Sequence, residues 1–300
     1  MVVNTFQYMK KSKRRKLDIT VISDVHLGTF GCRATELNNY LKTINPKTLI
    51  LNGDIIDIWQ FKKRYFPKTH MKVIKQIMSF ISSGTKVYYI TGNHDEMLRR
   101  FKGFKLGSFE IVNKVVLEFD GKKGWFFHGD VFDVTMQHSK WLAKLGGIGY
   151  DTLIMINTAV NWISEKLGQG RLSFSKKIKN SVKSAVKFIN DFETTASTIA
   201  IDEGYDYVVC GHIHQPEMRI IENEKGKTNY LNSGDWIENL TALEYNNQKW
   251  KLYEYEKDEL AKKAPQNIEV NDVELIKAEK TTSQLFDDLL IEFNINKFSK

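Results

Sequence analysis

The sequence predicts a fold of the α/β class, in which strands and helices alternate along the chain. Three short apolar runs, at residues 17–22, 48–51 and 87–90, have the composition of buried strands. Two amphipathic segments with helical spacing separate them, one at residues 34–44 and one from Pro67 to Gly84. Ligands of such folds bind at the carboxyl ends of the strands, so the residues that follow each strand are the first candidates for function.

After the third strand the pattern changes to hairpins and one long helical segment. Asp120-Gly121 is typical of a hairpin turn, and Asn246-Asn247 marks the turn of a last hairpin at residues 240–255. Further strands are predicted at residues 109–112, 115–119, 125–127, 207–210 and 229–231. Residues 137–203 are predicted to be helical, with amphipathic stretches at 151–167 and 174–202.

Composition excludes several classes of protein. With 300 residues and 42% apolar content, the chain can bury a sizeable core. Cys32 and Cys210 stand far apart, which argues against a disulfide framework and fits a reducing compartment. The chain opens with no secretory signal, and no apolar run approaches the roughly 18 residues of a membrane span. We therefore expect a cytoplasmic protein.

Charge divides the chain into three parts. We expect a basic tail at residues 1–16, a folded domain at 17–256 and a charged tail at 257–300 with one short helix at 284–293. The net charge is +8, and residues 10–16 are basic at all but one position. Such a surface favours phosphate-rich partners, whether nucleic acid, an anionic membrane or a nucleotide-linked substrate. A solvated tail that aids solubility explains the basic segment equally well.

Carboxylate, amide and imidazole side chains gather at the ends of five predicted strands. The residues concerned are Asp24, His26, Asp54, Asn93, His128, His212 and His214. With His94 included, these blocks hold five of the seven histidines of the chain. A lone histidine after a strand is more often a core or surface residue, but five at strand ends beside Gly and Asp point to a metal site.

The spacing of these residues gives a mechanical reason for metal binding. Asp24 and His26 are two residues apart, so in extended chain both side chains leave the same face, and His212 and His214 repeat this spacing. The carboxylate of Asp54 has two oxygens and can bridge two ions. Mixed oxygen and imidazole ligands suit Mn²⁺, Fe²⁺ or Zn²⁺ better than Ca²⁺. Seven ligands with one bridge predict two divalent ions, about 3.5–4 Å apart, with Mn²⁺ as our first choice.

In chain order the blocks are D-x-H, G-D-x-x-D, G-N-H-D, H-G-D and G-H-x-H, and they resemble those of the calcineurin-like metallophosphoesterase superfamily. The resemblance covers residues 17–255. It implies a two-sheet α/β/β/α sandwich that hydrolyses phosphoesters with the two ions. The implied ligands of one ion are Asp24, His26, Asp54 and His214, and those of the other are Asp54, Asn93, His128 and His212.

The resemblance also implies two catalytic residues that bind no metal. His94 would lie near the scissile phosphate as general acid or electrostatic stabiliser, and Asp95 would orient it. A non-catalytic binding module on this scaffold would normally have lost ligands, whereas all seven are present here.

Within the superfamily, the chain looks like the UDP-2,3-diacylglucosamine pyrophosphatase family of lipid A synthesis. The features that carry this likeness are Trp59, Gln215-Pro216, residues 232–236 and the helical insertion at 137–203. Members release UMP and leave 2,3-diacylglucosamine 1-phosphate, working peripherally on the inner membrane with a helical lid over the acyl chains. The likeness implies substrate contacts at Asn93, His94, His212 and Lys183. The best-known members carry arginine where this chain has His94.

The insertion allows two interpretations. Its apolar face between residues 153 and 167 is surrounded by basic residues between 166 and 187, a combination typical of an interfacial element on an anionic membrane. An ordinary helical cap packed on the sheet explains the same pattern equally well. The alternative function is a phosphodiesterase or nuclease with the same metals, which would need aromatic stacking platforms near basic grooves.

Overall fold

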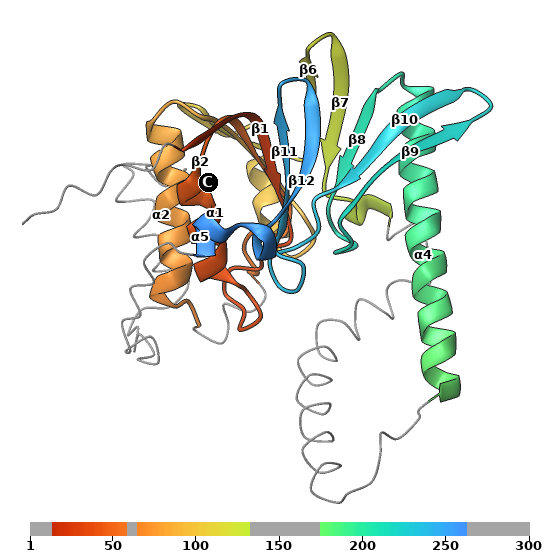
Figure 1. The fold of residues 1–300 in the computed structure, drawn as a ribbon, viewed down its shortest axis with the longest axis horizontal. Coiled ribbons are helices and arrows are strands. Elements are labelled where there is room, and N and C mark those ends of the chain that lie inside the picture. The colour runs from red at the N-terminus through yellow and green to blue at the C-terminus, as the bar shows by residue number, and fades with distance from the viewer. Residues whose placement is uncertain (1–13, 59–64, 133–174, 263–300) are drawn as a thin grey trace, which may run out of the picture.

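Two β-sheets face each other in the structure, a computed structural model that describes residues 14–58, 65–132 and 175–262 (Figure 1). The larger sheet has the strand order β12-β11-β1-β2-β3-β5-β4. Its strands are β1 (Arg15–Ile22), β2 (Ile44–Asn52), β3 (Lys86–Ile90), β4 (Lys105–Leu106), β5 (Phe109–Val112), β11 (Thr241–Asn246) and β12 (Lys249–Glu254). The smaller sheet has the order β6-β7-β8-β10-β9. Its strands are β6 (Lys114–Phe119), β7 (Lys122–Phe127), β8 (Tyr207–Cys210), β9 (Glu217–Asn223) and β10 (Gly226–Asn232).

Helices cover the outer face of each sheet. The α-helices are α1 (Ala34–Thr43), α2 (Lys68–Ser82), α4 (Ser175–Asp202) and α5 (Glu259–Lys262), and the 3-10 helices are η2 (Glu96–Phe101), η3 (Asp130–Phe132) and η4 (Tyr255–Lys257). In Figure 1, α1, α2 and α5 lie beside the larger sheet, and α4 lies beside β8, β9 and β10. The order of layers is therefore helix, sheet, sheet, helix, and the predicted α/β/β/α sandwich is confirmed.

Alternation of side chains along the strands builds one apolar layer on each side of each sheet. Between the sheets, Val21 and Ile50 pack in one cluster with Phe126 and Val209 of the smaller sheet. A second cluster joins the outer face of the larger sheet to α1 and α2, and a third joins the smaller sheet to α4 through residues such as Phe192. Apolar residues on both faces explain why the central strands are continuous apolar runs in the sequence.

Parallel pairing brings the carboxyl ends of the central strands together. β1, β2 and β3 run parallel in the larger sheet, and β7, β8 and β10 run parallel in the smaller one. The polar blocks follow the ends of five of these six strands, and the sixth, β10, ends at Asn232 and is followed by residues 233–236. Topology thus carries distant parts of the sequence to the same end of the sandwich.

Several boundaries differ from the prediction. β1 begins at Arg15, so the last two residues assigned to the basic tail belong to the sheet, where Arg15 forms an ion pair with Glu244. β2 begins at Ile44 and includes Pro46, which lies opposite Leu17 of β1 and before Thr48, where the pairing of β2 with β3 begins. At the other end, Ala261 of α5 is fully buried, so the fold extends beyond residue 257. The strands β4 and β9 were not predicted, because one has two residues and the other is a charged edge strand.

Some predictions fall outside the described residues. They concern Trp59, the amphipathic stretch 151–167, most of the tail at 1–16 and the short helix at 284–293. The stretch predicted at 174–202 corresponds to α4. Within the described residues, no helix has the length and the apolar content needed to cross a membrane.

Burial of His70 makes the stability of the fold depend on pH. His70 of α2 is buried, and its Nδ1 accepts a hydrogen bond of 2.9 Å from the backbone N–H of Gly28. Burial disfavours the charged imidazole and lowers the pKa of His70 from 6.5 to about 4. Since the unfolded chain then takes up the proton first, the free energy of unfolding contributed by His70 falls as the pH drops from 6.5 towards 4.

We expect His70→Asn to flatten this part of the pH dependence. The native protein should lose about 3 kcal/mol more than the variant between neutral pH and pH 4. Urea unfolding of both proteins along a pH series measures the difference. Parallel pH profiles would show that His70 is not held neutral in the folded state.

Candidate metal centre

The loops that carry the predicted ligands have an unusual backbone. Asp24, His26, Asp54, His212 and His214 all have positive φ angles, between 52° and 68°. Asp and His tolerate this left-handed region better than most residues, and such conformations concentrate at functional sites. The prediction that Asp24 and His26, or His212 and His214, lie in extended chain is therefore wrong. The left-handed residues at these positions turn the backbone instead of extending it.

Backbone hydrogen bonds between neighbouring loops hold these turns in place. The N–H groups of Asp24 and His26 donate to the carbonyls of Gly53 and Asp54, over 3.1 and 2.9 Å. On the other side, the N–H of Trp236 donates to the carbonyl of Asp24 over 3.0 Å. The loop after β1 is thus tied to the loop after β2 and to the segment after β10, which stabilises its left-handed residues.

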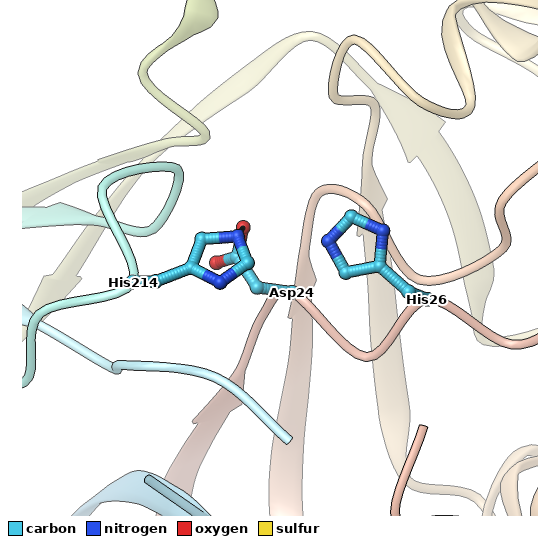
Figure 2. A group of neighbouring side chains, drawn as sticks. All are labelled: Asp24, His26 and His214. Atoms are coloured by element: carbon cyan, nitrogen blue, oxygen red, sulfur yellow. Dashed lines mark ion pairs between the residues drawn. The ribbon is translucent and has the colours of Figure 1, made fainter. Parts of the chain in front are cut away.

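Asp24, His26 and His214 form the first group of possible metal ligands. Each offers an atom within 4.8 Å of the others, and the Nε2 of His214 lies 3.2 Å from Oδ1 of Asp24. In Figure 2, the ring of His214 approaches the Asp24 carboxylate from the β8 side, and His26 extends from the same loop as Asp24. Burial alone would raise the pKa of Asp24, but the neighbouring His214 outweighs it and lowers that pKa to about 2.

His128 and Asp54 face each other in a second group, which also includes Asp24. The Nε2 of His128 lies 3.2 Å from Oδ2 of Asp54. Its Nδ1 lies 2.9 Å from the carbonyl oxygen of Asn52, which only accepts hydrogen bonds, so Nδ1 carries the proton and Nε2 is left to bind an ion. Burial disfavours the imidazolium, yet the charge of Asp54 outweighs it and raises the pKa of His128.

Asp54 belongs to two of the three groups of possible ligands. Besides its position near Asp24 and His128, it belongs to a third group with His26 and His94, and its Oδ1 accepts the backbone N–H of His94 over 2.8 Å. A carboxylate that lies among donors from β1, β3 and β7 is placed as a bridging ligand would be. The bridging role itself stays a prediction.

The donor set fits divalent metal ions. Asp24, Asp54 and His128 are almost fully buried, and unpaired charges are costly in such a place. The Nε2 of His26 is buried and has no hydrogen-bond partner in the described part of the chain, which a metal bond would satisfy. Carboxylate oxygens with imidazole nitrogens form the mixed set that borderline divalent metals prefer.

Close packing of glycine against this group fixes its geometry. A Cβ atom on Gly92 would lie 2.2 Å from Oδ1 of Asp54 and 2.7 Å from Cδ2 of His128. The loop after β3 therefore passes so close to both side chains that only glycine fits. This contact explains the glycine of the G-N-H-D block.

The orientation of His94 differs from the prediction. Asp95 does not contact the His94 ring. Its carboxylate accepts hydrogen bonds from the N–H groups of Ile55 and Gly92 and from the Tyr89 hydroxyl, and it holds the loops together. Asp57 takes the predicted place, with Oδ2 2.9 Å from Nδ1 of His94 and 3.6 Å from Nδ1 of His26. The second Asp of the G-D-x-x-D block was the sequence signal for this partner.

His212, Asn93 and Lys183 are the remaining residues that the sequence predicts for the site. The His212 ring centroid lies 5.1 Å from that of His128, and the His212 N–H donates to the Asp24 carboxylate. Asn93 follows Gly92 in the same loop and is half-buried. Lys183 lies in α4, at a position whose side chain is not among those described. These substrate contacts stay predictions.

The layered fold and the buried cluster of carboxylates and imidazoles agree with the metallophosphoesterase class that the sequence predicts. The family model of the calcineurin-like phosphoesterases matches residues 17–216, and the chain belongs to this family. It is therefore a phosphoester hydrolase, and the family uses a dimetal centre for which the structure supplies candidate ligands.

Individual relatives are more distant. A protein of Aliivibrio fischeri named UDP-2,3-diacylglucosamine hydrolase is 24% identical over 80% of this chain and 99% of its own length. The DNA double-strand break repair protein Mre11 of Methanococcus maripaludis is 25% identical over 64% of this chain and 47% of its own. A solved archaeal phosphodiesterase, 14% identical, superposes with a TM-score of 0.37 over 79% of this chain and 98% of that one.

Replacing Asp54 should remove metal. Purified wild-type protein loaded with Mn²⁺ is expected to hold about two ions per chain. Asp54→Asn keeps the shape and tolerates the left-handed backbone, but it removes the charge, so at least one ion and nearly all activity should be lost. Metal analysis by mass spectrometry measures this, with the exposed Asp202→Asn as matched control. Unchanged metal content in Asp54→Asn would contradict the shared carboxylate.

Proposed function

We propose that the protein hydrolyses the pyrophosphate bond of UDP-2,3-diacylglucosamine and releases UMP and 2,3-diacylglucosamine 1-phosphate. The observation that carries the proposal is the likeness to the Aliivibrio fischeri protein of that name, which spans 99% of that relative. The match covers 80% of this chain, so it includes the insertion between His128 and His212. A protein that shared only the phosphoesterase fold would not need a similar insertion.

We propose the ligand set expected from the sequence, and the three groups of neighbouring carboxylates and imidazoles support it. One ion would be held by Asp24, His26, Asp54 and His214, and the other by Asp54, Asn93, His128 and His212. When bound, two such ions lower the pKa of a water molecule and offset charge on a phosphoryl oxygen. We propose Mn²⁺, with Fe²⁺ or Zn²⁺ as alternatives, because the proposed ligands combine oxygen donors from Asp and Asn with nitrogen donors from His.

We propose that His94 serves the reaction directly. Its side chain is 32% exposed, whereas its partner Asp57 is 4% exposed. Burial disfavours the charged imidazole, but the hydrogen bond to Asp57 and the charge of Asp54 outweigh it and raise the pKa of His94. With Nδ1 held by Asp57, Nε2 is the nitrogen available to donate a proton to the leaving phosphate or to stabilise its charge.

A lipid-linked substrate would bring the protein to a membrane surface. We propose a cytoplasmic protein that lies peripherally on the inner membrane, with the segment 137–203 covering the acyl chains. The described part of this segment, α4, packs its C-terminal half on the smaller sheet through Phe192, Ala196 and Ala200, and in Figure 1 its other end projects beyond the sheets. Lys183 belongs to α4, and we propose that it contacts the substrate, as the likeness to the pyrophosphatase family implies.

A nuclease or other phosphodiesterase is the second candidate. The likeness to an Mre11 protein favours it, as does His94, which replaces the arginine of the best-known pyrophosphatases. The Mre11 match covers less than half of that relative and the hydrolase match almost all of its own, so we favour the pyrophosphatase.

Product analysis distinguishes the two functions. The Mn²⁺-loaded protein should convert UDP-2,3-diacylglucosamine to UMP and 2,3-diacylglucosamine 1-phosphate, with a kcat/KM at least about 10³-fold above that for bis-p-nitrophenyl phosphate or single-stranded DNA. Mass spectrometry and thin-layer chromatography identify the products. Faster cleavage of DNA, or no UMP from the lipid, would contradict the proposal.

His94→Ala tests the division between metal binding and chemistry. General acid help is typically worth about 10²–10⁴-fold, so kcat should fall by that order while two ions stay bound. Asp57→Asn should lower kcat by a smaller factor, because the ring of His94 loses its charged partner but remains present. Loss of metal from His94→Ala would mean that His94 is a ligand, as its position near His26 and Asp54 allows.

A further inference from the structure

An aromatic pair, Phe30 and Tyr65, begins four residues after the candidate ligand His26. The Phe30 side chain is 75% exposed, although its ring packs against that of Tyr65 with centroids 3.9 Å apart and the two rings tilted by 32°. The contact with Tyr65 restrains the Phe30 ring and leaves most of it open to solvent. Isolated exposed apolar residues are common on protein surfaces, but a ring backed by a second ring is a rigid, flat platform.

Buried contacts fix this pair relative to the metal ligands. The Tyr65 ring packs edge-on against His70 at 5.8 Å, and His70 accepts the N–H of Gly28. Gly28 has a φ of 104°, and a Cβ there would lie 3.5 Å from the carbonyl of Asp57 and 3.9 Å from that of Tyr65. The loop after β1 therefore approaches the backbone of both Tyr65 and Asp57, and Asp57 contacts His26 and His94.

The loop between His26 and Phe30 is short and folded back on itself. Both the N–H and the hydroxyl of Thr29 donate to the carbonyl of His26, over 3.1 and 2.9 Å. Four residues span at most about 14 Å when extended, so this turn places Phe30 nearer than that to the ligand His26. This distance is comparable to the length of a nucleotide. A nucleotide whose phosphate lies at the metal centre can therefore place its base near Phe30.

The chemistry of the platform favours a planar base over an acyl chain. A flexible chain is bound by a groove of aliphatic side chains that surrounds it, whereas a flat ring gains most by stacking on one exposed face. Base–aromatic stacking typically strengthens binding by about 5- to 150-fold per base. It needs no hydrogen-bond partner on the platform, which suits a phenyl ring.

We infer that Phe30, supported by Tyr65, stacks on the nucleobase of the substrate and so forms the nucleoside subsite of the enzyme. The inference deepens the proposed function and rests on it for the identity of the base as uracil. The same stacking chemistry could serve a base of single-stranded nucleic acid, and the substrates used in the test separate these two sources.

Binding of UMP and of ribose 5-phosphate to the Mn²⁺-loaded protein, measured by isothermal titration calorimetry, tests the subsite. The two probes share the sugar and phosphate and differ in the base. Wild-type protein should bind UMP at least about 10-fold more tightly than ribose 5-phosphate. Phe30→Ala should remove most of this preference, and Phe30→Trp should keep it. The matched control is Ile220→Ala, which changes another exposed apolar residue, 64% exposed on β9.

Two results would overturn the inference: no preference for UMP in the wild type, or an undiminished preference in Phe30→Ala. Turnover then identifies the source of the base. A fall in kcat/KM of Phe30→Ala on UDP-2,3-diacylglucosamine supports the uridine subsite. If the wild type fails to cleave that lipid, while Phe30→Ala loses both UMP affinity and activity on single-stranded DNA, the stacking subsite stands and the proposed substrate is wrong.

Discussion

The structure depends on the compensation of buried negative charge at the ends of its parallel strands. Asp24 and Asp54 lie among the carboxyl ends of β1, β2 and β7, where water does not reach them. Their charges are balanced by His214 and His128, whose pKa values are raised despite burial. Divalent ions provide the same compensation and would displace those protons, so metal affinity must depend on pH.

This constraint explains why both sheets are needed. Asp24, His26, Asp54 and His94 follow strands of the larger sheet, and His128 and His214 follow strands of the smaller one. The inter-sheet layer around Val21 and Phe126 sets the separation of the two sheets, and thereby the distance between the two halves of the centre. Because close-packed interiors resist compression, a change of volume in this layer would be felt at the ligands.

Much of this arrangement could be predicted from the sequence, because buried parallel strands are apolar runs and their polar ends stand out. The orientation of His94 could not. Asp95 is its neighbour in the sequence, yet folding brings Asp57 from another loop to the ring. The Phe30–Tyr65 pair could not be predicted for the same reason. Its members are far apart in the sequence and meet only when the loop after β1 packs on the start of α2. Sequence spacing indicated which residues gather, and tertiary contacts decide how each ring is oriented.

The left-handed backbone of the ligand loops has a consequence for how this site can change in evolution. At Asp24, His26, Asp54, His212 and His214 the chain adopts a conformation that costs most residues about 1–2 kcal/mol, and β-branched residues more. A position that no longer needed a ligand would therefore still favour Asn, Asp, His or Gly. Relatives that have lost the metal would be expected to keep polar or glycine residues there, as a conformational trace of a chemistry they no longer perform.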